Sequence, residues 1–209
     1  MTRSGVQRLY ERAGGRWWNL FRTVWEPTTA RRAVRDLCSL LAEYLTEDSR
    51  VLDLGCGPGT NLGRILDLSL PFNRYVGMDF SPSMIALAEK KFGDVQNVSF
   101  LEVDATVLRD DGDRYDLIVS TWLLDHLDEA AEVVNNARCL LAPGGHLVML
   151  YYGYPRWYVA FWQVPSGWLL RAAPVSDEEV SRFQGVLTKQ RYRAGAVVLV
   201  DIEAPTPGG

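Results

Sequence analysis

The stretch that most constrains the fold is a short apolar run that passes through three alternating glycines into a helical pattern. Residues 51–54 predict a buried strand, because the run is too short and too closely followed by glycine for a helix. Gly55, Gly57 and Gly59 come next, and a helix is expected to begin just after them. Such a turn carries few side chains, so backbone N–H groups at the helix start can approach a ligand closely.

Two chemistries use this kind of loop, and the spacing of the glycines separates them. The dinucleotide fingerprint needs a third glycine three residues after the second. Counting from Gly57 gives Thr60, and counting from Gly59 gives Leu62, so the fingerprint fails. The pattern that remains is Asp-x-Gly-x-Gly-x-Gly, with Asp53 inside the strand end. The alternative interpretation is a tight strand-to-helix turn that binds nothing.

Strand and helix patterns alternate through the middle of the chain. Four further strands are predicted, at 74–79, 98–104 and 114–120 and, after a helix exit and a glycine turn, within 141–150, with helical patterns between them. This alternation favours an α/β fold with a Rossmann-like, doubly wound parallel sheet. In such sheets ligands lie at the carboxyl ends of the strands. The candidate residues at these ends are Asp53, Gly55, Asp79, Asp104 and Ser120.

The sequence predicts one domain over residues 1–209, built in four parts. An N-terminal helical cap, which includes a helix from about Thr28 to Leu45, precedes a core. Two late strands are expected to form an antiparallel pair that completes a seven-stranded sheet. The parts are the cap (1–46), the core (50–150), an aromatic insertion on the substrate side (151–175) and a C-terminal helix with strands 186–192 and 196–202 (176–204).

Composition and charge limit the classes of binding partner and the cellular compartment that we expect. The net charge of −4 over 209 residues gives no electrostatic reason to expect nucleic acid binding. Cys38, Cys56 and Cys139 are far apart and form no Cys-x-x-Cys, which predicts free thiols, a reducing compartment and no structural metal. The chain begins without an apolar leader and has no run of eighteen apolar residues, so we expect a cytoplasmic protein. The oligomeric state stays open.

Residues 1–35 are basic and aromatic. Eight arginines face only two glutamates, and Trp18, Phe21 and Trp25 share one face of a helix. A helix of this kind can make a peripheral contact with an anionic membrane surface. The preferred interpretation is a helix that caps the core, with its arginines solvated.

A second aromatic segment follows the fifth strand. Eight of the eighteen residues in 151–168 are aromatic. This composition fits a hydrophobic substrate, a lipid surface or an oligomer contact. The alternative is ordinary packing of a cap over the core.

Three ordered motifs resemble those of the class I S-adenosylmethionine-dependent methyltransferases. The first is the Asp-x-Gly-x-Gly-x-Gly loop, the second is Gly77-Met-Asp-Phe-Ser-Pro-Ser-Met-Ile85, and the third is Leu141-Ala-Pro-Gly-Gly-His-Leu147. The segment from strand four to His126 also matches the family pattern. In the third motif Pro143 is expected to end a helix and the glycines to turn the chain back into the sheet.

The resemblance implies S-adenosylmethionine as cofactor. In the family the glycines abut the amino acid part of the cofactor, and the acid in the Asp53 position supports the loop and the cofactor's ammonium group. Asp79 is expected to accept both ribose hydroxyls, and Asp104 with Ala105 to contact the adenine. The expected cofactor-binding residues are Asp53, Gly55, Cys56, Gly57, Gly59, Asn61, Asp79, Phe80, Met84, Asp104, Ala105, Ser120 and Thr121.

The implied reaction is in-line transfer of a methyl group from a sulfonium to a nucleophile, for which the protein supplies alignment and desolvation. Where the acceptor must lose a proton, His126 is the first candidate base, because it follows strand four and an unperturbed histidine titrates near neutrality. Asp125 and Tyr151 or Tyr152 come next. The alternative for His126 is local packing at a helix start.

The sequence favours a small-molecule acceptor. No Asn-Pro-Pro-Tyr-type sequence follows strand four, so the family's usual signature for methylation of nucleic acid bases and glutamine is missing. The first hypothesis is an apolar or aromatic acceptor such as a lipid, quinone or secondary metabolite. The alternatives are an enzyme that uses S-adenosylmethionine without methylating, such as an aminopropyl transferase or a cyclase, and a non-catalytic cofactor-binding protein.

Overall fold

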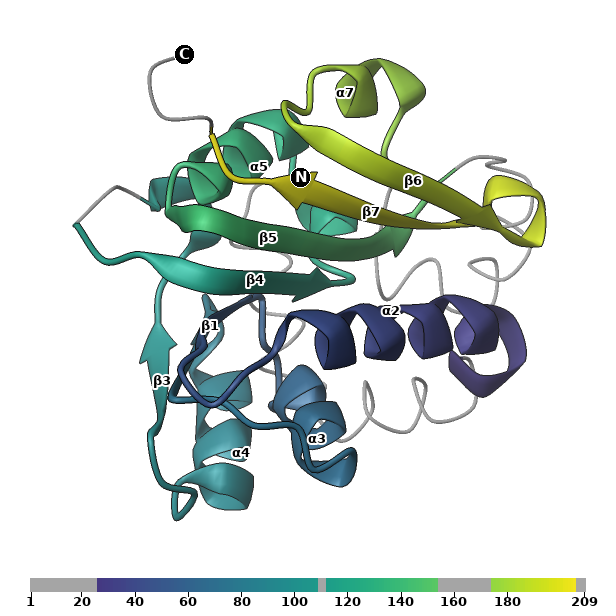
Figure 1. Cartoon of the computed structure of the whole chain (residues 1–209). Coiled ribbons are helices and arrows are strands. Elements are labelled where there is room, and N and C mark those ends of the chain that lie inside the picture. The colour runs from purple at the N-terminus through teal and green to yellow at the C-terminus, as the bar shows by residue number, and fades with distance from the viewer. Residues whose placement is uncertain (1–25, 109–111, 154–173, 206–209) are drawn as a thin grey trace.

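The structure is a computed structural model that describes residues 26–108, 112–153 and 174–205. A seven-stranded sheet runs through the described chain in the order β3-β2-β1-β4-β5-β7-β6 (Figure 1). The first five strands are parallel, whereas β7 is antiparallel to both β5 and β6. The strands are β1 (Arg50–Leu54), β2 (Arg74–Asp79), β3 (Val98–Glu102), β4 (Tyr115–Thr121), β5 (Leu141–Tyr152), β6 (Val186–Tyr192) and β7 (Val197–Glu203).

Helices cover both faces of this sheet, as the strand–helix alternation predicted. The α-helices are α2 (Arg31–Tyr44), α3 (Thr60–Asp67), α4 (Pro82–Phe92), α5 (Ala130–Arg138) and α7 (Asp177–Ser181). Short helical turns complete the described chain, namely η1 (Glu26–Ala30), η2 (Ala105–Val107), η3 (Leu124–His126) and η4 (Arg193–Gly195). The predicted doubly wound fold is confirmed.

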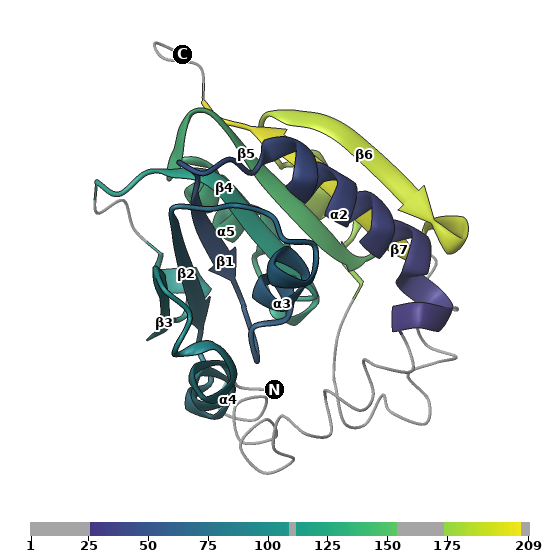
Figure 2. The ribbon, with the colours of Figure 1, turned by 60° about the horizontal axis from the view of Figure 1, so that its bottom comes forward.

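Alternation along the buried strands divides the core into two clusters. Val51 of β1 packs with α2 and α3 on one face, and Leu52 packs with α5 and α7 on the other. Figure 2 shows α2 and α3 on the same side of the sheet. Asp53 follows the parity of Val51, so its carboxylate points into the face that α3 covers.

The strand order changes direction between β1 and β4, because the chain moves from β1 outward to β3 and then returns to β4. Ligands of open α/β sheets bind at the carboxyl ends of the strands beside such a switch point. The loop after β1 and the residues after β4 therefore lie together at the place where a ligand is expected.

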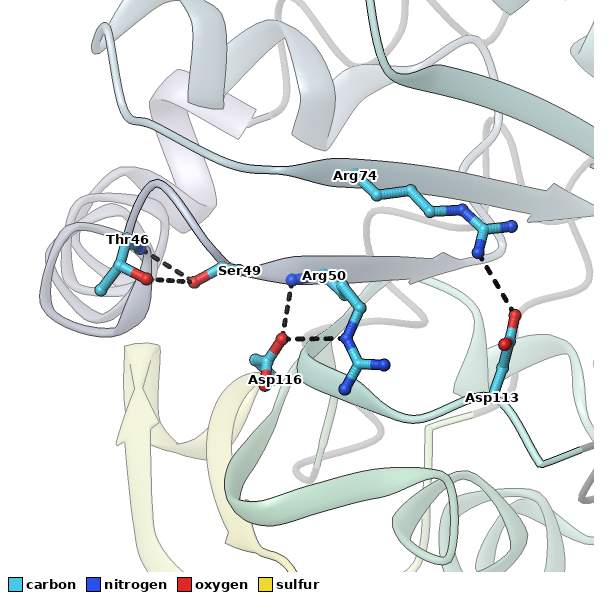
Figure 3. A network of polar contacts seen from close by, with 6 residues as sticks. All are labelled: Thr46, Ser49, Arg50, Arg74, Asp113 and Asp116. Atoms are coloured by element: carbon cyan, nitrogen blue, oxygen red, sulfur yellow. Dashed lines mark hydrogen bonds and ion pairs between the residues drawn. The ribbon is translucent and has the colours of Figure 1, made fainter.

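Polar contacts join the amino ends of the strands, at the opposite end of the sheet from the glycine loop (Figure 3). The backbone N–H of Arg50 donates to Asp116 at 2.8 Å, and its Nε donates to the same oxygen at 3.4 Å. Arg74 donates to Asp113 at 3.4 Å. These contacts connect the starts of β1, β2 and β4, so they lie away from the carboxyl ends of the strands, where a ligand is expected.

One local prediction was wrong. Pro143 does not end a helix: α5 already ends at Arg138, and the Pro-Gly-Gly sequence lies inside β5, where a register shift between Tyr115 and Leu117 of β4 accommodates it. The helix expected from about Thr28 to Leu45 is confirmed, with the π-helical turn η1 followed directly by α2.

The division of the chain into cap, core, insertion and C-terminal part stays a prediction. The basic amphipathic helix expected within residues 1–25 lies outside the described residues, and so does most of the aromatic segment. In the part of the chain that is described, no helix is long and apolar enough to cross a membrane.

Candidate functional site

The glycine loop after β1 is tied to the neighbouring strand. The backbone N–H groups of Gly55 and Cys56 both donate to the carbonyl oxygen of Met78 in β2, at 2.8 and 2.9 Å. Gly55, Gly57 and Gly59 all have positive φ, at 68°, 54° and 79°, a conformation that favours glycine. The three glycines are therefore required by the backbone itself.

The surroundings of these glycines differ in a way that marks the ligand side. A Cβ on Gly55 would lie 3.0 Å from Leu123, and one on Gly59 would lie 2.7 Å from the Phe92 ring. A Cβ on Gly57 would have no atom of the described residues, other than its chain neighbours, within 4 Å. Gly57 thus exposes its backbone to open space, which fits a cofactor that approaches the loop closely.

Asp79 at the tip of β2 closes the loop from one side. Its Oδ2 accepts the backbone N–H of Gly57 and its Oδ1 accepts the backbone N–H of Ser81, each at 2.9 Å. Burial raises the pKa of Asp79, and these two hydrogen bonds act in the opposite direction. Only 8% of the residue is exposed, so Asp79 is not a solvated strand-end acid. Its position beside the glycine loop fits a group that accepts hydrogen bonds from a ribose.

Asp53 lies beneath the loop and is fully buried. The Tyr75 hydroxyl donates to Oδ2, and Asn61 Nδ2 donates to Oδ1 at 2.9 Å. Burial raises the pKa of Asp53 to about 6, against the lowering effect of these hydrogen bonds and of the Arg64 charge. Both carboxylate oxygens of Asp53 are therefore held by neighbouring side chains beneath the loop.

Sequence reasoning selected Thr121 but missed Arg64 and Glu26, which complete the polar contacts around Asn61. Arg64 Nη1 donates to Asn61 Oδ1, and Thr121 Oγ1 donates to the same oxygen at 3.3 Å. Arg64 Nη2 pairs with Glu26 Oε1, which also accepts the Trp122 indole N–H at 3.3 Å. The signal available in the sequence was Arg64 one helical turn after Asn61, which places both on the same face of α3.

Other predicted cofactor residues take structural roles in this arrangement. Ser120 Oγ donates to the Leu54 carbonyl oxygen at 2.9 Å, which joins β4 to the end of β1. Asp104 caps η2 by accepting the N–H and hydroxyl of Thr106 at 2.9 and 2.8 Å. The buried Cys56 has its pKa raised by burial, so it remains a thiol.

Three more predicted residues lie after β2 and β3, near the adenine end that the resemblance implies. Met84 of α4 and Ala105 are buried, whereas Phe80 is half-buried at the end of β2. The role of each predicted cofactor residue stays a prediction.

The candidate bases lie after β4 and at the end of β5. Asp125 is buried in η3, and its Oδ1 accepts the backbone N–H of Tyr152 at 2.8 Å. Within the described ranges its Oδ2 has no hydrogen-bond partner, and burial raises the pKa of Asp125 well above the usual value. Burying an oxygen without a hydrogen bond costs free energy of folding, and a bound group that donates a hydrogen bond to it would remove that cost.

His126 was expected to titrate near neutrality, and the structure contradicts this. The ring is half-buried beside Asp125, and burial lowers its pKa to about 4. His126 is therefore neutral at physiological pH and is only a weak proton acceptor. Asp125 becomes the stronger candidate base.

Tyr151 is fully buried at the end of β5 and packs edge-on against Phe183, with ring centroids 6.3 Å apart. Its hydroxyl has no hydrogen-bond partner in the described part of the chain. Burial raises the pKa of Tyr151, the charge of Arg191 acts in the opposite direction, and the charge of Asp125 adds to the rise. Tyr152 points to the other face, where its ring lies 5.0 Å from that of Trp122. Trp122 has a φ of 61°, a strained conformation for a bulky residue, directly after β4.

Comparison with known proteins agrees with this geometry. Residues 52–147 match the family model described as a methyltransferase domain. A trans-aconitate 2-methyltransferase from Streptomyces avermitilis is 34% identical over 122 residues, which are 56% of this chain and 44% of that enzyme. The aligned part therefore spans less than half the length of that relative.

Two solved structures share the fold at low sequence identity. One is from the complex of the Haloferax volcanii Trm112 methyltransferase activator with a putative methyltransferase, with a TM-score of 0.72, 23% identity and coverage of 93% of this chain and 96% of that one. The other is the N-methyltransferase NodS of Bradyrhizobium japonicum in complex with S-adenosyl-L-homocysteine, with a TM-score of 0.63, 18% identity and coverage of 84% and 87%.

The matched family model runs from β1 into β5 and includes the glycine loop, Asp79 and the residues after β4. The described fold matches the S-adenosylhomocysteine complex over most of both chains. Residues 52–147 are therefore similar to a methyltransferase domain with the fold of S-adenosylmethionine-dependent methyltransferases, and this match supports S-adenosylmethionine as the cofactor.

Proposed function

We propose that the protein transfers the methyl group of S-adenosylmethionine to a small, largely apolar acceptor that presents one polar nucleophilic group. The observation that carries this proposal is a pair of buried oxygens that have no hydrogen-bond partner among the described residues, Asp125 Oδ2 and the Tyr151 hydroxyl. Buried polar atoms in folded proteins are nearly always paired, so two such atoms from adjacent elements support a ligand group between or beside them.

Apolar surroundings support the character of the acceptor. The Tyr151 ring packs edge-on against Phe183, and Leu123 lies against Gly55, while Trp122 and Tyr152 are in ring contact on the other face. Aromatic side chains of this kind favour a hydrophobic or planar acceptor. The aromatic composition of residues 151–168 agrees with this proposal.

The cofactor supplies an electrophilic methyl group on a sulfonium. The residues of this chain align the acceptor and exclude water. Asp125 would accept the acceptor's proton at Oδ2, because its raised pKa makes the ionised carboxylate a stronger base than an exposed aspartate. The Tyr151 hydroxyl would orient the same polar group.

The test is methyl incorporation from labelled S-adenosylmethionine into a matched panel of acceptors. The panel contains an alkyl-substituted hydroquinone, an alkyl amine and trans-aconitate, the last because the Streptomyces relative is named for it. Transfer to the hydroquinone or amine, with little to the tricarboxylic acid, is the expected result. Preferred transfer to the acid would overturn the apolar assignment.

The alternatives have separate outcomes in the same experiment. A non-methylating enzyme would consume S-adenosylmethionine, or convert an acceptor, without moving the label, which mass spectrometry detects. A non-catalytic protein would bind the cofactor and convert nothing. Adding anionic liposomes tests a lipid acceptor and the contact proposed for the basic N-terminus. The Haloferax complex gives a reason to test an activator protein when turnover is low.

A further inference from the structure

Glu26 brings together side chains from two elements of the site. It lies in the first turn of η1, and its Oε1 meets both Arg64 Nη2 from α3 and Trp122 Nε1 after β4. The side chains of Glu26 and Arg64 are 10% and 11% exposed, so this ion pair is largely shielded from solvent. A pair so buried has a desolvation cost that an apolar pair of the same size would not have. Stability alone therefore gives a weak reason for its presence.

The second arm of Arg64 determines how Asn61 points. The Asn61 amide oxygen receives donors from Arg64 Nη1 and Thr121 Oγ1. An amide has one oxygen and one NH₂ group, so two donors at the oxygen exclude the flipped orientation. Nδ2 must then face Asp53, to which it donates at 2.9 Å.

Only an arginine can make this bridge. The planar guanidinium presents several N–H donors in a fixed fork, whereas a lysine ammonium is a single point of charge on a flexible stem. Arg64 uses one nitrogen for Glu26 and another for Asn61. The chain of contacts thus runs from Glu26 through Arg64 and Asn61 to Asp53 beneath the glycine loop.

We propose that Arg64, anchored by Glu26, is a positioning residue of the cofactor site that fixes the Asn61 amide against Asp53. The inference rests on the proposed assignment of Asp53 and Asn61 to the cofactor site. Arg64 acts through Asn61 and need not touch the cofactor itself.

The proposal has an electrostatic consequence, because several groups face Asp53. Tyr75 and Asp79 come from β2, Arg64 comes from α3 and the Cys56 thiol comes from the loop. Burial raises the pKa of Asp53 to about 6, while Tyr75, Asn61 and Arg64 lower it and Asp79 raises it. Two of the three lowering groups depend on Arg64, so losing Arg64 should raise this pKa further.

The ionised form of Asp53 attracts the positive charges of S-adenosylmethionine. Affinity should therefore fall as pH drops through the Asp53 pKa. The test is calorimetric titration of S-adenosylmethionine into the protein between about pH 5 and 7.5, where Asp53 changes charge. Arg64→Met should raise the midpoint of the affinity-versus-pH curve by about one pH unit. On the acidic side of neutrality this shift lowers the affinity for S-adenosylmethionine by about tenfold.

Two variants separate positioning from charge. Arg64→Lys keeps the charge and much of the volume but lacks the planar fork of N–H donors. The variant should fold, and the midpoint of its affinity-versus-pH curve should still lie above that of the wild type. A wild-type midpoint in Arg64→Lys would overturn the positioning role. Glu26→Ala removes a negative charge, and this change alone would lower the midpoint. A higher midpoint in Glu26→Ala would therefore show that the anchor of Arg64 has been lost, and a lower midpoint would contradict the anchoring role.

Controls distinguish this inference from the assignment of the site. Glu47→Gln removes the same charge from an exposed position after α2 and should titrate like wild type. Asp79→Ala should weaken binding by about 10–100-fold at every pH, and normal binding there would mean that the site itself is misassigned. Weakened binding in Asp79→Ala together with a wild-type profile in Arg64→Met would overturn the positioning role alone.

Discussion

Asp79 Oδ2 lies 2.9 Å from the backbone nitrogen of Gly57 and accepts its N–H, so the tip of β2 holds the glycine loop that follows β1. The two residues are 22 positions apart in the chain. One carboxylate therefore shapes the loop and also stands where a ribose is expected.

Replacing Asp79 should weaken cofactor binding. Asp79→Ala removes hydrogen bonds to a charged acceptor and frees the loop, so the dissociation constant for S-adenosylmethionine should rise by about 10–100-fold. Isothermal calorimetry measures it. Asp67→Ala, at an exposed position at the end of α3, is the matched control and should bind like wild type. Equal affinities in the two variants would contradict the assignment.

The glycines should separate binding from stability. Gly57→Ala and Gly59→Ala both place a Cβ at positive φ, which costs about 1–2 kcal/mol of unfolding free energy. Gly59→Ala adds a clash at 2.7 Å with Phe92 and should lose about 1–3 kcal/mol more. Gly57→Ala should lose more cofactor affinity, because its methyl enters the open space of the loop. Urea unfolding and calorimetry on both variants check this, and the reverse ranking would be evidence against it.

Asp53 should make stability depend on pH in an unusual direction. Its folded-state pKa of about 6 lies above the unfolded value of 3.8, so the folded protein binds more protons between these two values. Stability contributed by this group is present below about pH 4 and is lost as pH rises to about 6, by on the order of 1–3 kcal/mol. Urea unfolding across this range should show a smaller loss for Asp53→Asn than for wild type. Parallel curves would contradict the raised pKa.

Asp125 should matter for catalysis and little for cofactor binding. Asp125→Asn keeps the size of the side chain and can still accept the Tyr152 N–H, but it cannot take a proton. Turnover of a proton-losing acceptor should fall by about 10²–10⁴-fold, with unchanged affinity for S-adenosylmethionine. His126→Gln should cost far less, because a histidine with a pKa of about 4 is a weak base. A larger loss in His126→Gln would reverse the assignment.

Local sequence signals were sufficient for the architecture. Short apolar runs bounded by glycine, alternating with helical patterns, predicted the parallel strands of the doubly wound sheet and the antiparallel pair β6 and β7. Strand limits agreed within a few residues, because hydrophobic alternation and turn residues act locally. Pro143 was misinterpreted because a Pro-Gly-Gly sequence is equally compatible with a helix exit and with an irregular strand start.

The site was predicted only where its residues lie next to a strand end. Asp53, Gly57, Asp79 and Asp125 could be found in this way, since a strand end fixes their position in the fold. The protonation states of the site residues could not be predicted from the sequence. The pKa values of Asp53 and His126 depend on burial by elements from elsewhere in the chain.

Residues that are close along the chain specify the fold, the glycine loop and the acids at the strand ends. Packing between distant elements, by contrast, is needed for Tyr75 and Asn61 to meet on Asp53, and for Glu26 to join Arg64 to Trp122 across separations of 38 and 96 residues. Hydrogen bonds and burial depend on such packing, whereas periodicity and spacing describe only one element at a time.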